Sequence, residues 1–587
     1  MDSSPSILAS QPPSLSSSLC HQFMDTQLLL GLAHLSPSPL QWNAISNGVI
    51  SRPFGLVELF FYKMSTIHHG RTDIFYRLPF KCSTPGILQK LPIAWAKLHQ
   101  RHPSLSFNIV DNQFTLDLNT LSTDPVSLLT HSSTSLVYHT DYNHDVVTWM
   151  REHLWNGDRK YLSDTQLARL FVFHNPKSNQ VDIVLAIAHC ISDGTSVVAL
   201  MNEFLELLTS DEVARVSARV DVPNLSNYNT FKPQVHVESN DSLSFLHADR
   251  QDILAALPMA AESGYPPLPA TVTPPSVPRL RWYWAIRRVV SQVRSEALNR
   301  LTTLEFIGEN APQTQKELEP SWGALTDWKQ ETLSAQQTAV VMAYSRACGV
   351  KIGSLLFAAS TIAISNLNHK HADKSFGGDT CIVGFPFSLR PYLSPRRERS
   401  TPSVISGTAD VSPMSVQLGF GGIQLPSTPC YADSPTFKNR FAYRAQSARR
   451  QFDKLLSSPT LLQDGHLMAL SRASNFSKGD DGWKSIKQDQ SQEKKRGKGT
   501  AINASMIGAM DRVIKREYSS VNGAVSLDSS RTAYIGVRCR QHELLLETFT
   551  LNGQLTITLG HDKVMWNDEC VREYLQEFRR ILEALAM

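Results

Sequence analysis

Alternating and helix-spaced apolar positions predict strands and helices along most of the chain. Residues 170–174 and 181–188 are apolar runs on either side of a turn-rich segment, which predicts a β-hairpin whose second strand is buried. After an Asp-Gly turn, apolar residues recur at helical spacing over 197–208. The predicted order of strand, turn and helix brings the turn residues to the edge of a sheet.

The same kind of pattern predicts elements on both sides of this hairpin. A helix is expected to begin near Pro85 and to stop before Pro103, and two helices are expected to join at Gly349. The Asn-Gly pair at 552–553 predicts a second hairpin, and Asn567 is expected to cap a final amphipathic helix.

The chain has 587 residues, 42% hydrophobic and 19% charged, enough for a large core divided between two domains or halves. Polar and proline-rich stretches suggest the boundaries. We expect a loose Ser/Pro-rich extension at 1–50, a first half at 51–225, a proline-rich crossover and helix at 226–333, and a second half at 334–587 with a mobile insertion at 477–500.

Charge and cysteine usage exclude several classes of function. The formal net charge of +4 is too small an excess for nucleic-acid binding. The 8 cysteines form no C-x-x-C pair, so we expect no metal site and a reducing compartment, the cytoplasm. The first 50 residues contain no lysine or arginine, unlike a secretory signal or a mitochondrial transit peptide.

Residues 281–294 mix arginines with large aromatic residues. Such a stretch could be a membrane-surface helix or part of a ligand entrance. A partly packed helix with a solvated basic face is the more common structure for this composition, so we expect no membrane contact.

The candidate chemistry lies in Ala188-His189-Cys190-Ile191-Ser192-Asp193-Gly194, at the end of the buried strand. Strand alternation places His189 on the apolar face, where partial desolvation favours the neutral imidazole that can accept a proton. Asp193 can hold the turn through a charge-assisted bond to an arginine, and Gly194 lets the chain reverse where a side chain would obstruct.

Other interpretations of these residues stay open. A satisfied core histidine beside an ordinary Asp-Gly turn would give the same His-x-x-x-Asp-Gly pattern. Cys190 could be mistaken for a nucleophile, but as the strand neighbour of His189 it should point to the opposite face and pack in the core. The chain has no G-x-S-x-G, P-loop or H-E-x-x-H motif, so the usual signs of a serine hydrolase, an NTPase or a zinc peptidase are missing.

At this motif the chain resembles the superfamily of coenzyme A-dependent acyltransferases. Further blocks follow in the order that the superfamily has: Arg52 with Gly55, Leu56 and Glu58; Ala94-Trp95 to Leu98 with Arg101-His102-Pro103; Pro386 to Arg390; and Asn503 to Gly508. Condensation domains usually carry two adjacent histidines, and Ala188 in the first place argues against peptide-bond synthesis. The Asp-Phe-Gly-Trp-Gly block of plant enzymes is also absent, so the nearest resemblance is to fungal alcohol acetyltransferases and trichothecene-type O-acetyltransferases.

The resemblance implies an α/β (α+β) fold of two halves similar to chloramphenicol acetyltransferase, each a mixed sheet with flanking helices, and an active-site tunnel between them. It implies transfer of an acyl group, most simply acetyl, from acyl-CoA to a hydroxyl of a small secondary-metabolite alcohol, without an acyl-enzyme. His189 would be the general base and Asp193 would orient the loop, with Gly194 and Arg390 as structural support. Ser505 is a candidate oxyanion or substrate donor.

Acyl-CoA and the alcohol are then the expected small-molecule partners, with no permanently bound cofactor, no nucleic acid and a monomeric chain. Two alternatives stay open: an enzyme that takes its acyl group from a carrier protein or forms an amide as condensation domains do, and a non-catalytic binding protein of the same fold. The structural alternatives for Arg390 and Ser505 are an ordinary surface arginine and a buried strand hydroxyl.

Overall fold

The computed structural model describes residues 40–585, apart from short gaps of one to four residues and six longer segments at 219–244, 266–281, 294–324, 372–379, 394–413 and 475–501. The predicted insertion at 477–500 and most of the predicted extension at 1–50 therefore lie outside the described residues. The last residues of that extension are not loose, because they form β1 (Asn43–Ser46) and the start of β2 (Val49–Pro53).

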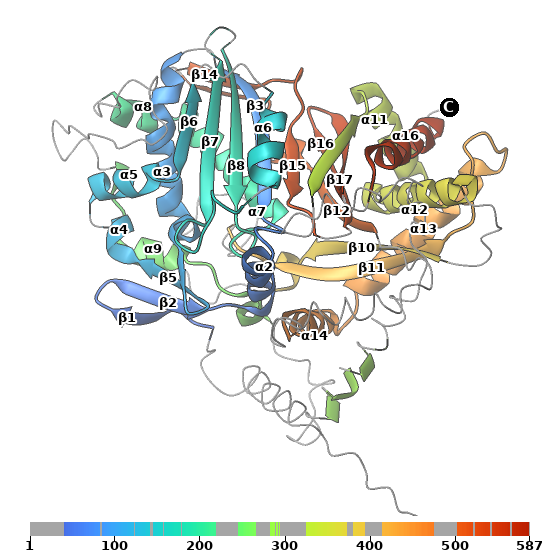
Figure 1. The fold of residues 1–587 in the computed structure, drawn as a ribbon, viewed down its shortest axis with the longest axis horizontal. Coiled ribbons are helices and arrows are strands. Elements are labelled where there is room, and N and C mark those ends of the chain that lie inside the picture. Colours follow the sequence, from blue (N-terminus) through green and yellow to red (C-terminus); the bar gives the residue numbers. More distant parts are fainter. Residues whose placement is uncertain are drawn as a thin grey trace, which may run out of the picture.

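The first large sheet occupies the left of Figure 1 and has seven strands. In spatial order they are β13 (Glu517–Ser520), β14 (Gly523–Leu527), β3 (Ile74–Cys82), β8 (Gln180–Ile187), β7 (Ala168–Asn175) and β6 (Leu136–Thr140), with β15 (Tyr534–Val537) also paired to β3. The β6 and β7 strands are parallel and the other pairs are antiparallel, so the sheet is mixed.

The second large sheet has six strands and is also mixed. Its spatial order is β11 (Leu418–Pro426), β10 (Thr380–Ser388), β12 (Ile502–Ala509), β16 (Leu544–Leu551), β17 (Gln554–Asp562) and β9 (Thr326–Thr332). The β12 strand is parallel to both of its neighbours. A smaller antiparallel sheet consists of β1, β2, β5 (Gln113–Asp117) and β4 (Asn108–Val110).

Helices cover the large sheets because each sheet buries an apolar face. The first half contains α2 (Leu56–Ile67), α3 (Leu91–Arg101), α4 (Leu118–Ser122), α5 (Pro125–Ser133), α6 (Val146–Met150), α7 (Gly194–Thr209), α8 (Asp211–Ser217) and α9 (Arg250–Ala256). The second contains α11 (Ala335–Ala347), α12 (Ile352–His371), α13 (Phe437–Leu456), α14 (Leu461–Ser474) and α16 (Asp568–Ala584). Alternate residues of β8 pack with α3 and α7 on one face and with α6 on the other.

The elements predicted from periodicity are confirmed. The β7 and β8 strands form the expected hairpin, and β16 and β17 form the second one across Asn552 and Gly553. The helix after Pro85 is a 3-10 turn that continues as α3, and α11 and α12 meet near Gly349 with a bend of 102°. The Asn567 side chain caps α16 by accepting a hydrogen bond from the backbone N of Cys570.

The two sheets do not follow the order of the chain. The β13, β14 and β15 strands come from residues 517–537, which lie between two strands of the second sheet in sequence, yet they pair with the first sheet. Both sides of β3 are therefore occupied, with β8 on one side and these late strands on the other.

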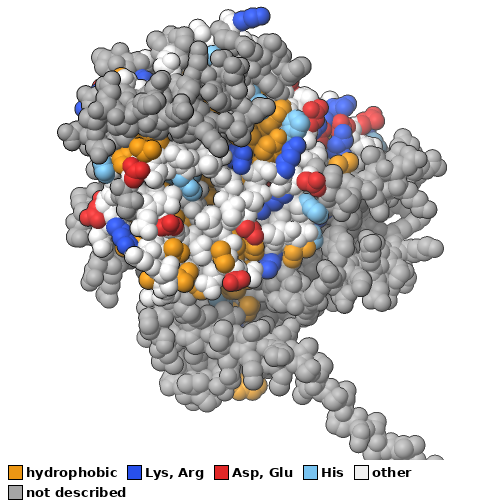
Figure 2. All heavy atoms as spheres, turned by 60° about the vertical axis from the view of Figure 1, so that its left-hand side comes forward, with side chains coloured by type: hydrophobic (Ala, Val, Ile, Leu, Met, Phe, Trp, Pro, Cys, Tyr) orange, Lys and Arg blue, Asp and Glu red, His pale blue; other side chains and the backbone are white. Residues whose placement is uncertain are grey.

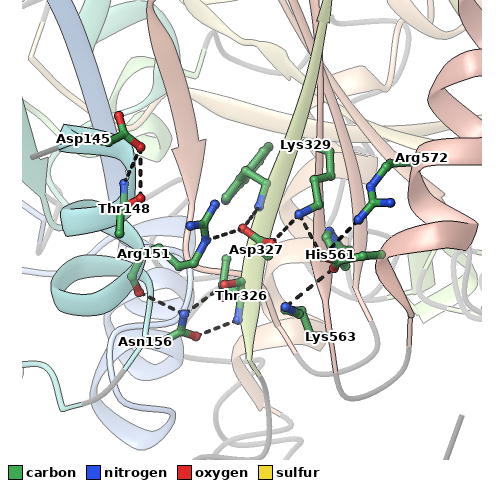
Figure 3. A network of polar contacts seen from close by, with 12 residues as sticks. Asp145, Thr148, Arg151, Asn156, Thr326, Asp327, Lys329, His561, Lys563 and Arg572 are labelled. Atoms are coloured by element: carbon green, nitrogen blue, oxygen red, sulfur yellow. Dashed lines mark hydrogen bonds and ion pairs between the residues drawn. The ribbon is translucent and has the colours of Figure 1, made fainter.

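A polar network also joins the halves (Figure 3). Arg151, at the end of α6, donates from Nε to Oδ1 of Asp327 on β9 at 2.9 Å. The amide of Asn156 accepts from the backbone N of Thr326 at 2.8 Å and donates to its carbonyl at 3.0 Å. Because Asp327 is buried, the ion pair with Arg151 holds β9 against the first half.

Among the described helices, none is by itself long and apolar enough to cross a bilayer, and one bent pair, α11 with α12, passes that test by length and composition.

Candidate active site

The His-x-x-x-Asp-Gly motif forms the predicted connection between a buried strand and a helix. The β8 strand ends at Ile187, two residues before the histidine, and the turn is closed by a hydrogen bond from the backbone N of Ile191 to the carbonyl of Ala188 at 3.1 Å. Asp193 is the N-cap of α7, and its side chain accepts a hydrogen bond from the backbone N of Ser196, a group that the helix itself leaves unpaired.

His189 is half-buried and lies flat against a phenyl ring. The ring centroids of His189 and Phe61 are 3.6 Å apart, and the ring planes differ by 6°. Burial lowers the pKa of His189 to about 4, against smaller opposite effects from its own backbone, Asp193 and the backbone of Ser192. The imidazole is therefore neutral at physiological pH.

The two nitrogens of this imidazole differ in their surroundings. Nδ1 is buried and makes no hydrogen bond within the described chain, whereas Nε2 is not enclosed in this way. Hydrogen bonding to its own backbone nevertheless favours the protonated ring of His189. Of the two nitrogens, Nε2 is therefore the candidate for contact with a ligand.

A buried ion pair fixes the start of the helix that carries Phe61. Arg52 on β2 binds Glu58 of α2 with both terminal nitrogens, at 2.9 and 2.8 Å, and both side chains are buried. Glu58 also accepts a hydrogen bond from the backbone N of Gly55 at 2.6 Å. These residues belong to the first block of the sequence resemblance, and their contacts fix α2 and therefore the ring that covers His189.

Asp193 uses its whole carboxylate to hold the loop. Oδ1 accepts hydrogen bonds from the backbone N and the Oγ of Ser196, at 3.0 and 3.1 Å. Oδ2 accepts from Nη1 of Arg390 at 2.8 Å and from the backbone N of Gln417 at 3.2 Å. Two of the four bonds come from the second half of the chain, so this carboxylate joins the halves beside the motif.

Arg390 makes further contacts at the same place. Its Nη2 donates to Oγ of Ser196 at 2.8 Å and to the carbonyl of Ser415 at 2.9 Å. The guanidinium thus bridges the first turn of α7 and the segment that leads into β11. A planar group with several donors suits this position because it binds acceptors in two directions at once.

Gly194 is required by the close approach of β12. A Cβ built on Gly194 would lie 2.8 Å from Cδ1 of Ile507, and the backbone of Gly194 has an ordinary conformation. The glycine therefore serves packing between the two halves, and Ile507 reaches to within one residue of Asp193.

Ser505 lies on β12, two residues before Ile507, which falls in a register shift of the strand between Met506 and Gly508. It is directly opposite Glu547 of β16, which is opposite Thr558 of β17, which in turn is opposite Gln330 of β9. These four residues form a polar row across four adjacent strands. The flanking residues of β16 on this face pack with the cores of the first half, so the row faces that half.

Glu547 is the member of the polar row that sequence reasoning missed. Its side chain is buried, and its Oε2 has no hydrogen-bond partner in the described part of the chain. Burial raises the pKa of this carboxyl well above its usual range, and the nearby charge of Glu543 adds to the effect. Glu547 is therefore a neutral acid with an O–H to donate, on the strand next to the one that touches the motif turn.

The thiol of Cys190 is buried, and burial raises its pKa far above the usual range. The reactive form of a cysteine is the thiolate, which this environment disfavours. The residue packs as a core side chain.

One cluster has the side chains of a metal site. Ligand atoms of Asp327, His561 and Asp568 lie within 4.8 Å of one another. Nζ of Lys329 lies 2.8 Å from Asp327 and 2.9 Å from Asp568, so an ammonium group already binds both carboxylates. The cluster is a part of the network that joins the halves.

Comparison with known proteins supports the fold and not a closer relationship. No protein-family model and no curated protein matches the chain. In structure it is similar to TRI3 trichothecene 15-O-acetyltransferase from Fusarium sporotrichioides, with a TM-score of 0.69 and 13% identity over 94% of this chain and 99% of that one. The chain has the two-lobed acyltransferase fold. This confirms the predicted fold of two mixed-sheet halves with flanking helices, and the tunnel between them stays a prediction.

Two further solved structures have the same architecture. Polyketide synthase associated protein 5 from Mycobacterium tuberculosis has a TM-score of 0.50 and 13% identity over 90% of this chain and 97% of that one. The first condensation domain of the calcium-dependent antibiotic synthetase has a TM-score of 0.50 and 11% identity over 91% of this chain and 96% of that one. Acyltransferases and condensation domains thus share this fold.

Proposed function

We propose that this protein transfers an acyl group, most simply acetyl, from acyl-CoA to a hydroxyl of a small alcohol, with His189 as the general base. The observation that carries the proposal is the neutral imidazole of His189, half-buried beside contacts from both halves, with Nδ1 buried and Nε2 as the candidate basic nitrogen. A neutral alcohol is a poor nucleophile, and a positioned base is what it lacks in water.

In the proposed reaction, Nε2 of His189 takes the hydroxyl proton while the oxygen bonds to the thioester carbonyl carbon. The carbonyl becomes an oxyanion, the carbon–sulfur bond then breaks, and the imidazolium returns its proton to the departing thiolate. A ring whose pKa is about 4 is a weak base at rest. The oxyanion that forms beside it stabilises the imidazolium as the reaction proceeds. Base catalysis of this kind contributes about 10²–10⁴-fold, and holding both substrates together contributes further.

Asp193 and Arg390 act as positioning residues in this proposal. All four hydrogen bonds of the Asp193 carboxylate hold the loop, so it has no bond to spare for substrate. Ser505 is the proposed oxyanion donor, since it belongs to the strand whose Ile507 lies against Gly194. Glu547 beside it offers a second O–H.

A hydroxyl acceptor is favoured over an amine by two considerations. Ala188 stands where condensation domains usually have a further histidine. The fold is also similar to that of a trichothecene 15-O-acetyltransferase, which is an argument by analogy of fold alone.

The proposal is tested by incubating the protein with acetyl-CoA and a panel of hydroxylated metabolites, and by measuring coenzyme A release and product mass. We expect alcohol-dependent release with the wild-type chain and at least about 10²-fold less with His189→Ala. Equal release by the variant would refute the base assignment.

The same assay separates the alternatives when it is repeated with carrier-bound acyl donors and with amine acceptors. A protein that accepts acyl groups from a carrier protein but not from acyl-CoA belongs to the condensation-like alternative. So does a protein that acylates amines but not alcohols. A protein that binds acetyl-CoA without releasing coenzyme A with any acceptor is a binding protein.

A further inference from the structure

An unusual share of the exposed apolar surface lies in one short helical segment. Five of the large apolar side chains in the described part of the chain are on residues 282–293, and their exposed fractions are 69% for Trp282, 57% for Ile286, 61% for Val289, 37% for Val290 and 58% for Val293. We call these five residues the apolar row. Sequence reasoning expected a partly packed helix with a solvated basic face, and in the described residues of the segment these apolar side chains face solvent.

The spacing of the apolar row places it on one side of a helix. The members follow one another at intervals of four, three, one and three residues, which is the periodicity of a single helical face. The described residues of the segment are helical, and Figure 1 draws this helix in green below α14, apart from both sheets.

The segment is tied to the rest of the protein by Arg287. Its Nη1 donates to Oγ1 of Thr460 at 2.9 Å and to Oδ1 of Asp464, on α14, at 3.0 Å. Its guanidinium also lies 5.5 Å from the ring centroid of Tyr283. This contact holds the helix to the body while the members of the apolar row stay exposed.

The charge of the segment has one sign. Between Glu262 and Glu296 the chain has five arginines, at positions 279, 281, 287, 288 and 294, and no aspartate, glutamate or lysine. Acidic and basic side chains are mixed over the described part of the face in Figure 2. An exposed apolar face with a tryptophan, next to arginines and no acids, fits the interface of an anionic lipid bilayer.

We propose that the apolar row inserts into the surface of anionic membranes, which the arginine-rich composition of the segment favours. The α14 helix that holds Arg287 packs against α2, whose Phe61 stacks on His189. A bound membrane would therefore lie two helices from the candidate base. The membrane proposal stands without the proposed reaction, because it rests on exposure and charge alone.

The test is flotation of the full-length chain with vesicles of phosphatidylcholine alone or with about 30% phosphatidylserine, in about 0.15 M salt. We expect at least about tenfold more bound protein with phosphatidylserine, and a loss of about tenfold or more in Ile286→Asp and in Trp282→Ala. Val110→Asp is the matched control, because Val110 is 53% exposed on β4 and receives the same charge elsewhere. It should bind like the wild type, and all variants should keep the wild-type melting temperature.

Three results would overturn the proposal. The first is no binding to either vesicle, and the second is equal binding to both vesicles or by all the variants. The third is a dimer in size-exclusion chromatography without lipid that Ile286→Asp converts to a monomer. The apolar row would then be a self-association surface.

Discussion

Oδ2 of Asp193 lies 2.8 Å from Nη1 of Arg390, and none of the four hydrogen bonds of that carboxylate goes to the ring of His189. The motif aspartate thus joins two halves of the chain, and it positions the histidine through the backbone of the turn. The side chain of Asp193 is almost completely buried, so the pair is not screened as surface ion pairs are.

Arg390→Ala should lower both stability and turnover. Removal of one partner leaves a buried carboxylate uncompensated, and the expected loss in the free energy of unfolding is about 3 kcal/mol. Arg390→Lys keeps the positive charge but cannot bind acceptors in two directions at once. Its loss in the free energy of unfolding should be about half that of Arg390→Ala. Chemical denaturation measures both values. Arg449→Ala removes an exposed ion pair with Asp453 and should cost less than about 1 kcal/mol; a similar cost for Arg390→Ala would contradict the role given to the buried pair.

The pH dependence of kcat/KM should reflect a histidine that stays neutral in acid. Because the pKa of His189 is lowered to about 4 from 6.5, the basic form persists as the pH falls. The acid limb of the profile, where kcat/KM decreases as His189 is protonated, should therefore appear near pH 4–5. The unfolded chain binds this proton from pH 6.5 downward, so folding stability contributed by His189 should also decline between pH 6.5 and 4. An activity limb centred at 6.5 that His189→Ala removes would show that the ring is solvated.

Phe61→Ala should raise the pKa of His189 toward 6.5. The substitution removes the ring stacked at 3.6 Å and admits water to the imidazole. The acid limb of kcat/KM should move to higher pH, and the free energy of unfolding should fall by about 3 kcal/mol. Phe60→Ala is the control, because it removes a neighbouring ring that contacts Phe61 and Phe420 and leaves the stacked ring of Phe61 in place. It should destabilise the fold without moving the limb.

Glu547→Gln should stabilise the protein at alkaline pH. The pKa of Glu547 is raised in the folded state, so folding must keep a proton that the unfolded chain releases above its ordinary pKa of 4.5, and stability falls as the pH rises beyond that value. The amide has no such proton to lose. Its advantage in melting temperature should therefore be larger at pH 8 than at pH 5.

Glu543→Gln gives the opposite expectation and serves as the control. Although burial opposes it, Arg540 lowers the pKa of Glu543 by donating to it at 2.9 Å from Nε. This variant should be destabilised at neutral pH. If both variants behaved alike, Glu547 would have a partner.

Local pattern was sufficient for much of the scaffold. The hairpin of β7 and β8, the start of α7 at Gly194 and the cap of α16 depend on residues close together in sequence, so periodicity and turn chemistry predicted them. The order of strands could not be obtained in this way, because β13 to β15 return to the first sheet across more than 400 residues of chain.

Only part of the site could be predicted from the sequence, for the same reason. The motif identified His189, but the ring stacked on it belongs to α2, more than 120 residues away, and no local signal marks Phe61 as its neighbour. Glu547 looked like an ordinary strand carboxylate, and only the register of β12 with β16 sets it beside Ser505. In the 282–293 segment the pattern was clear, but it does not say which side of a helix faces the protein.

The return of β13, β14 and β15 to the first sheet has a consequence for synthesis. The sheet that carries the motif cannot be completed until the ribosome has made residues 517–537, near the end of the chain. Before that, one side of β3 is an open edge that can pair with other chains. Truncated mRNAs that end before codon 517 should therefore yield aggregated protein and no active truncated form.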